Sequence, residues 1–257
     1  MTSSIELSIV APIFNGADTI EEYILRTEKA LETLNGSYQI ILVDDGSTDG
    51  SLELMRTLQN EHQAVIIIKL RKNYGQSNAI AAGLTQAKGR YVIVMDSDLQ
   101  DKPEDIIPLY NEINRDGADM IIVTRPQINR SWWRNLCSVS FYYLTGLLTA
   151  LRFPCGSGVF RIMRQKCLDP LDEALRTPGT VLSFIHASGC TWKTISLPRE
   201  DNFLKKSSYT FGKMLNLALS RILPYSRLSL KCLGSNFFKR YIPEYSIEAI
   251  FPEQQDE

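Results

Sequence analysis

The sequence predicts an α/β fold in which a mostly parallel sheet is covered by helices on both faces. Apolar, β-branched runs alternate with helical segments through the first half of the 257-residue chain. These runs are continuously apolar, which is typical of strands buried on both faces, as in a parallel sheet. A composition of 44% hydrophobic and 22% charged residues is ordinary for a globular protein and allows a sizeable core.

Five strands are expected in this first half, each from a short apolar run bounded by polar or turn-forming residues. The runs cover Leu7–Ile13, Gln39–Val43, Ala64–Leu70, Tyr91–Met95 and Asp119–Thr124.

Helices are expected in the connections between these strands. A capping box at Asp18–Glu21 predicts the start of the first helix, whose apolar residues recur at helical spacing. Asp49 is expected to cap the second helix. The third is predicted over 76–87, with Gly89 as its stop, and the fourth at Pro103, since proline suits a first helical turn.

The second half of the chain is less regular. Its sequence predicts helices over 130–151 and 213–223, a turn over 154–158, a strand over 190–197, and a basic loop over 205–209. The acidic residues from Pro243 onward are expected to fray.

Composition excludes several classes of protein. A formal net charge of -1 does not favour nucleic-acid binding. Five widely spaced cysteines and two separated histidines do not favour a disulfide framework or a zinc site, and they fit a reducing cytoplasm. No signal peptide is expected at the N-terminus, and the charge-free run Asn135–Leu151 is shorter than the ~20 residues that a spanning helix needs.

Polar residues gather at the carboxyl ends of the expected strands, where ligands bind in parallel α/β sheets. These ends carry Pro12–Phe14, Asp44–Ser47, Arg71–Asn73, Asp96–Asp98 and Arg125.

Asp96 and Asp98 follow the fourth strand directly. In an extended segment, residues two apart point to the same side, so the two carboxylates can share one site. Mg²⁺ and Mn²⁺ prefer carboxylates together with substrate phosphates, and such an ion would neutralise a departing diphosphate. A bare Asp-x-Asp also occurs in ordinary surface turns, and that alternative stays open on this motif alone.

The segment Asp44–Asp49 has two readings. A carboxylate at this strand end can accept hydrogen bonds from a base or a ribose, and the same residues also suit a turn followed by a helix cap.

Taken together and in this order, these motifs resemble the family 2 glycosyltransferases, which have the GT-A fold. The resemblance covers roughly residues 5 to 233. The stretch Asp98–Glu104 (Asp-Leu-Gln-Asp-Lys-Pro-Glu) points to the branch of dolichyl- and polyprenyl-phosphate sugar synthases, which often carry membrane helices; none is expected in this chain. The matching segments are Val10–Asn15, Val43–Asp49, Asn73–Gly75, Asp96–Glu104, Gly156–Arg161, Lys206–Thr210 and Pro224–Arg227.

The resemblance implies a role for each matching residue. The donor nucleotide would be held by Pro12, Phe14, Asn15, Asp45, Asn73 and Asp96. The metal, Mg²⁺ or Mn²⁺, would be held by Asp96, Asp98 and Gln100. Catalysis would involve Asp98, Asp101, Arg125 and Arg161, with Arg134 as a further arginine near the diphosphate or a solvated helix residue.

Three positions depart from the family pattern. Gly16 and Val159 replace an expected glutamate and aspartate, and Ser208 replaces a lysine. The aspartate missing at Val159 would be the general base or an acceptor-binding carboxylate. Its loss leaves three readings: a phosphate acceptor that needs no base, another carboxylate such as Asp101 as base, or an impaired enzyme.

The expected function is therefore an inverting glycosyltransferase of cell-surface polysaccharide biosynthesis. It would move a sugar from a nucleotide-sugar donor, UDP-activated by preference, to a lipid-linked saccharide or polyprenyl-phosphate acceptor. Residues 1–125 would bind the donor, 126–242 would form the acceptor side, and 243–257 would be a flexible acidic tail. The alternatives are a nucleotide-binding scaffold of the same fold, or a nucleotidyltransferase, whose Gly-rich loop is missing from this sequence.

The expected location is cytoplasmic, with peripheral contact to the inner face of the plasma membrane as an option. The aromatic segment 130–152, flanked by arginines, and the segment 214–231 suit an interfacial helix. The competing readings are core packing and contact within a homo-oligomer.

Overall fold

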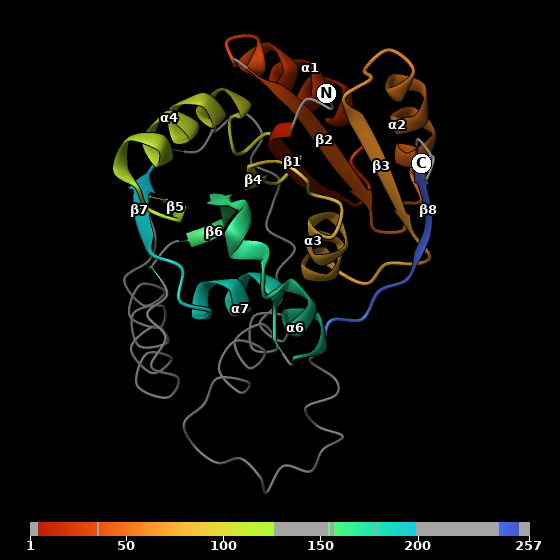
Figure 1. The fold of residues 1–257 in the computed structure, drawn as a ribbon. Coiled ribbons are helices and arrows are strands. Elements are labelled where there is room, and N and C mark those ends of the chain that lie inside the picture. Colours follow the sequence, from red (N-terminus) through yellow and green to blue (C-terminus); the bar gives the residue numbers. More distant parts are fainter. Residues whose placement is uncertain are drawn as a thin grey trace, which may run out of the picture.

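The computed structural model describes residues 5–34, 36–125, 154, 157–177, 179–198 and 242–251 (Figure 1). Across these residues, one eight-stranded sheet runs through the molecule in the order β7-β5-β6-β4-β1-β2-β3-β8. Among the helices of this described part, none has the length and apolarity to cross a bilayer.

The five predicted strands are confirmed. They are β1 (Ile5–Ile13), β2 (Ser37–Asp44), β3 (Val65–Leu70), β4 (Tyr91–Val94) and β5 (Met120–Thr124). The first four pair in parallel in the order β4-β1-β2-β3. The predicted strand over 190–197 is also confirmed as β7 (Trp192–Ser196), which pairs in parallel with β5.

Two further strands correct the sequence-based expectation. β6 (Ser157–Arg164) lies antiparallel between β4 and β5, although the sequence predicted only a turn over 154–158. β8 (Ile247–Phe251) pairs antiparallel with β3, where a frayed tail was expected. Its apolar residues pack on the sheet edge, and Glu248 forms an ion pair with Lys69 at 2.8 Å, so the acidic character of the tail did not prevent pairing.

Helices cover both faces of the sheet, as predicted. One face carries α1 (Ile20–Leu31), α2 (Ser51–Gln59) and α4 (Ile106–Asp116), the last preceded by the 3₁₀ turn η1 (Pro103–Asp105). The other carries α3 (Gln76–Leu84), α6 (Leu171–Arg176) and α7 (Val181–Ala187), with the 3₁₀ turn η2 (Gln165–Leu168) (Figure 1).

Each parallel strand contributes alternate residues to two separate cores. In β1, Leu7, Ile9 and Ala11 pack under α1, α2 and α4, whereas Val10 packs under α3. This is the expected consequence of side chains that point to opposite faces in succession, and it explains why the strands read as continuously apolar.

Some predicted helix boundaries were wrong. α1 begins at Ile20 after Thr19, which makes no side-chain cap, so the Asp18 capping box does not form. α3 ends at Leu84 and not at residue 87. The predicted helices over 130–151 and 213–223 and the loop over 205–209 lie outside the described residues.

The strands of the expected acceptor-side half, β6 and β7, belong to the same sheet as those of the first half. The functional division at residue 125 stays a prediction.

Candidate functional site

The carboxyl ends of β1 to β5 lie at one edge of the sheet, as the sequence predicted. β1 to β4 are parallel, and β5 shares their direction because the antiparallel β6 separates it from β4. Five loops with polar residues therefore leave the sheet on the same side.

The loop that follows β2, named the β2-end loop (residues 44–50), is held by its own acidic side chains. Asp44 Oδ1 accepts the Ser47 backbone N–H at 3.1 Å. Asp49 accepts the backbone N–H groups of Ala17 and Ser51, both at 3.1 Å. Asp49 thus satisfies the first turn of α2, as expected of a cap, although Gly50 occupies the N-cap position.

Asp45 is only 2% exposed and lies at the centre of this arrangement. Its two carboxylate oxygens accept the backbone N–H groups of Tyr74 at 2.6 Å and Gly75 at 2.8 Å. Burial, with a smaller contribution from the Asp44 carboxylate, raises the pKa of Asp45, while the two N–H groups oppose that rise. In this structure Asp45 holds the β3–α3 loop, and its predicted contact with a nucleobase stays a prediction.

The β2-end loop and the β3–α3 loop touch one another at Gly46. A Cβ atom at Gly46 would lie 2.6 Å from the backbone N of Asn73 and 2.7 Å from the carbonyl C of Lys72. Gly46 also has φ of +70°, so only glycine suits both the backbone and the contact. The exposed Asn73 is thereby placed beside Asp45.

The residues at the end of β1 face the same edge. Phe14 is 53% exposed, which is unusual for an aromatic ring beside a buried sheet. Asn15 has φ of +52°, and its Oδ1 accepts the Thr48 backbone N–H at 2.9 Å. The Pro12 carbonyl accepts the Ser97 hydroxyl at 3.3 Å and so connects β1 to the loop after β4. The donor-binding roles expected of these residues stay predictions.

In the loop after β4, named the β4-end loop (residues 95–101), burial alternates along the chain. Asp96, Asp98 and Gln100 are half-buried, whereas the residues between them, Ser97, Leu99 and Asp101, are buried. Asp96 and Asp98 are thus both partly accessible, as is Gln100. The loop is not the extended segment that the sequence-based argument assumed, since Leu99 has φ of +59°.

Two glutamine side chains contact these carboxylates. Gln76, the first residue of α3, donates from Nε2 to Asp96 Oδ1 at 2.5 Å. Gln100 donates to Asp98 twice, from its backbone N at 3.1 Å and from Nε2 at 2.8 Å. Sequence reasoning missed Gln76, although its place directly after the Asn73–Gly75 motif was a usable signal.

The donor chemistry at Asp96 and Asp98 fits a hard divalent cation, because both are half-open carboxylates on one side of a single loop. Within the described ranges, no group of three or more His, Cys, Asp or Glu side chains could hold a metal ion. The two aspartates would therefore share an ion with substrate oxygens. Gln100 donates its backbone and side-chain amide N–H groups to Asp98 and so orients that carboxylate. Its predicted role as a metal ligand stays a prediction.

Asp101 and Arg125, both predicted to be catalytic, form an ion pair with each other. Their side chains are only 6% and 11% exposed. The Arg125 guanidinium also lies over the Phe160 ring, 5.9 Å from its centroid. The pair therefore ties the β4-end loop to the end of β5, and a catalytic role for either residue stays a prediction.

Arg161 and Val159 both lie on β6. Arg161 pairs with Val94 of β4, and its guanidinium donates back to the carbonyls of Val159 and Gly158 at 3.1 and 2.9 Å. Val159 lies two residues before Arg161 on β6, toward the edge at which β4 ends. Val159 packs against the apolar core, so this position offers no carboxylate to the site. Arg134 lies outside the described residues.

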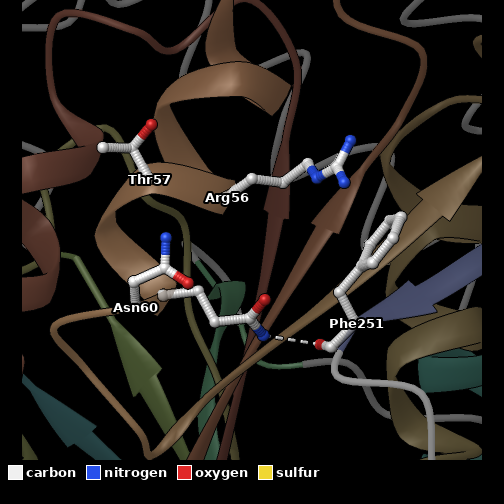
Figure 2. Close-up of a pocket in the computed structure, with 5 residues that line it drawn as sticks. Arg56, Thr57, Asn60 and Phe251 are labelled. Carbon is white, nitrogen blue, oxygen red and sulfur yellow. Dashed lines mark hydrogen bonds between the residues drawn. The ribbon is translucent and has the colours of Figure 1, made fainter.

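A separate polar hollow of about 300 Å³ lies between α2 and β8. Figure 2 shows Arg56 of α2 reaching toward the Phe251 ring, 4.6 Å from its centroid, and the Phe251 carbonyl accepts the Gln59 amide at 2.7 Å. Thr57 and Asn60 also line the hollow. The hollow lies beside the amino end of β3, since the Gln59 amide also donates to the carbonyl of Val65, the first residue of that strand. It is thus at the edge opposite the polar strand ends.

The sequence of this chain is similar to those of known glycosyltransferases. The family described as glycosyl transferase family 2 matches residues 8–171. An uncharacterized glycosyltransferase of Synechocystis is 31% identical over 229 residues, which is 89% of this chain and 72% of the relative. The undecaprenyl-phosphate 4-deoxy-4-formamido-L-arabinose transferase of Proteus mirabilis is 30% identical over 230 residues, 89% of this chain and 70% of the relative.

Solved structures share the fold at lower sequence identity. Mannosyl-3-phosphoglycerate synthase of Rubrobacter xylanophilus has a TM-score of 0.58 at 15% identity, over 90% of this chain and 76% of that one. Glucosyl-3-phosphoglycerate synthase of Mycobacterium tuberculosis, in complex with Mn²⁺, UDP and glucosyl-3-phosphoglycerate, has a TM-score of 0.55 at 18% identity, over 85% and 80%. The predicted GT-A-like fold is confirmed, and the chain belongs to glycosyl transferase family 2.

Proposed function

We propose that this glycosyltransferase uses a divalent cation and a nucleotide-sugar donor, and that it inverts the anomeric centre. The observation that carries the proposal is the open side of the β4-end loop, where Asp96 and Asp98 accept hydrogen bonds from glutamine side chains. A bound Mg²⁺ or Mn²⁺ would neutralise the charge of the departing diphosphate. The mycobacterial synthase, of the same fold, was crystallised with Mn²⁺ and UDP, which supports this choice of ligands.

The donor nucleotide would lie across the neighbouring strand ends. The exposed ring of Phe14 is suited to packing against a nucleobase, and the remaining lone pairs of Asp45 are suited to accepting its N–H. Pro12, Asn15 and Asn73 complete the pocket that we propose, with UDP as the preferred nucleotide. Arg161, on the adjacent β6, would face the diphosphate or the acceptor.

For the acceptor, we propose a polyprenyl phosphate in preference to a lipid-linked saccharide. A hydroxyl acceptor needs a general base, yet Val159 is apolar and Asp101 is buried in an ion pair with Arg125. A phosphate acceptor is already ionised and needs no proton removed. The Proteus mirabilis relative is named as an undecaprenyl-phosphate transferase, which supports the same chemistry. The reaction would then take place at the inner face of the plasma membrane.

Calorimetry with a panel of nucleotide sugars, with and without Mn²⁺, tests the donor half of the proposal. We expect one donor to bind in a metal-dependent manner, and Asp98→Ala to lose that dependence. Asp169→Ala, at an exposed aspartate beside η2, is the matched control. Absence of binding by every nucleotide sugar, with the fold intact, would refute the proposal.

Sugar transfer to polyprenyl phosphate, compared with transfer to the dephosphorylated alcohol, tests the acceptor half. We expect product only with the phosphate. Product with the alcohol would refute the preference for a phosphate acceptor and would require a general base such as Asp101. Metal-dependent donor binding without transfer to any acceptor would instead favour the nucleotide-binding scaffold.

A further inference from the structure

The junction between β3 and α3 connects the two acidic loops of the site. Residues 74–76 are bonded to the β2-end loop on one side and to the β4-end loop on the other. Asp45 accepts the backbone N–H groups of Tyr74 and Gly75 at 2.6 and 2.8 Å. The next residue, Gln76, donates its side-chain amide to Asp96 at 2.5 Å.

The backbone of Gly75 fixes the direction in which Gln76 leaves this junction. Gly75 is the N-cap residue of α3, with φ of 89° and ψ of 152°. Residues with a side chain rarely adopt this conformation, so glycine is needed for the sharp change from loop to helix. The buried Asp45 carboxylate accepts the Gly75 backbone N–H and so fixes the start of α3. This in turn fixes the backbone position from which the Gln76 side chain extends to Asp96.

The Gln76–Asp96 bond gives a partner to an exposed polar side chain in the first turn of α3, whose later residues are apolar. Gln76 is exposed, whereas Ala79 to Leu84 are buried against the sheet. Through this bond to Oδ1, the Gln76 amide restricts the orientation of the Asp96 carboxylate. Partners that orient a metal-binding carboxylate in this way commonly change metal affinity by about 10–100-fold when they are removed.

We infer that Gln76 is a positioning residue that orients Asp96 for the divalent cation, and that Asp45 fixes Gln76 through the Tyr74–Gly75 backbone. The inference rests on the proposed function, since it assumes that Asp96 and Asp98 bind a metal together with a nucleoside diphosphate. It gives Asp45 a second task, in which the residue expected to bind the base also sets the geometry of the metal-binding loop.

Gln76→Met tests the inference, because methionine keeps the length and helix compatibility of the side chain but has no N–H donor. We expect Mn²⁺ to bind about tenfold more weakly in the presence of saturating UDP, measured from free Mn²⁺ by electron paramagnetic resonance. UDP affinity in EDTA and the melting temperature should stay at the wild-type values. Ser77→Ala, at the neighbouring exposed position of α3, should leave all three unchanged.

Three outcomes would overturn the inference. Wild-type Mn²⁺ affinity in Gln76→Met would show that the amide bond does not matter to the metal. Equal loss of UDP binding with and without metal would show that Gln76 contacts the nucleotide. If the wild-type protein itself binds no Mn²⁺ with UDP, and Asp98→Ala changes nothing, the proposed function and this inference fail together; the first two outcomes leave the proposed function intact.

Discussion

The β2-end loop and the β4-end loop each contain three aspartates, but the hydrogen-bond partners and the exposure of these carboxylates differ between the loops. In the β2-end loop, Asp44, Asp45 and Asp49 all accept backbone N–H groups, from their own loop and from two neighbouring ones. In the β4-end loop, Asp96 and Asp98 accept chiefly from glutamine side chains and are half-open. The first loop uses its carboxylates to fix the backbone, and the second keeps Asp96 and Asp98 half-open, where we propose that a ligand binds.

Asp101 is the exception that tests this comparison, because it lies in the β4-end loop but is buried in an ion pair with Arg125. Removing one partner of a buried ion pair typically costs about 3–5 kcal/mol. We therefore expect Asp101→Asn to lower the free energy of unfolding by about 3 kcal/mol, measured by urea denaturation. Loss of transfer with unchanged stability would instead identify Asp101 as the general base.

Asp98→Asn should lower activity without lowering stability, the reverse of the effect expected for Asp101→Asn. We expect release of nucleoside diphosphate from the best donor to fall at least about 100-fold, since a bound metal ion contributes several kcal/mol of charge stabilisation in the transition state. The free energy of unfolding should not change, because Asp98 is half-open and, among the described residues, its hydrogen bonds stay within its own loop. A similar loss of activity in Asp169→Asn would contradict the assignment.

Asp45→Asn should lower the free energy of unfolding and, as a consequence, weaken nucleotide binding. The amide keeps one acceptor oxygen but turns an NH₂ group toward the N–H of Tyr74 or Gly75. A buried donor left without an acceptor costs about 1–3 kcal/mol, so we expect that loss of unfolding free energy, with weaker nucleotide binding. Normal stability with lost nucleotide binding would mean that Asp45 serves the base alone.

The smallest effect is expected at Glu104, just beyond the β4-end loop. Arg26 of α1 donates to both Glu104 oxygens, at 2.9 and 2.8 Å, and these bonds lower the pKa of Glu104 from its ordinary value of 4.5. Because the folded pKa is lowered, the stabilisation is complete above the unfolded value and is lost as the pH falls through the folded value. Glu104 is 53% exposed, so we expect at most about 1 kcal/mol.

Thermal unfolding of wild type and Glu104→Gln across acidic pH checks this prediction. The two proteins should differ at neutral pH and converge in acid. A stability difference that grows as the pH falls would show that the bonds to Arg26 do not favour the ionised form of Glu104.

The sequence was sufficient to predict the parallel part of the fold. β1 to β5 are continuous apolar runs, and the polar residues that follow them could be assigned to one edge because parallel strands share a direction. The strand β6 could not be recognised in the same way. Its start, Ser157-Gly158, has turn-forming residues, and its place between β4 and β5 depends on pairing between distant segments of the chain.

The sequence pointed to candidate site residues that lie together in one loop. It did not reveal contacts between residues of different loops. Asp96 and Asp98 directly follow an apolar strand that the sequence marks clearly, so they were accessible to sequence reasoning. The contacts of Gln76 with Asp96 and of Asp101 with Arg125 join separate strand ends, and no local pattern reports such distances. The tail pairs as β8 because Ile247, Ile250 and Phe251 pack on the sheet, and this packing outweighs the acidic character of the segment.

The insertion of β6 has a consequence for how such an enzyme can diversify. Thr124 at the end of β5 pairs with Ser157 at the start of β6, so the chain between them departs from and returns to adjacent positions on the sheet. Both attachment points lie at the edge where the polar strand ends gather. Exchange of this segment between relatives therefore needs only two matched junctions, and the parallel strands that carry the predicted donor-binding residues need not change.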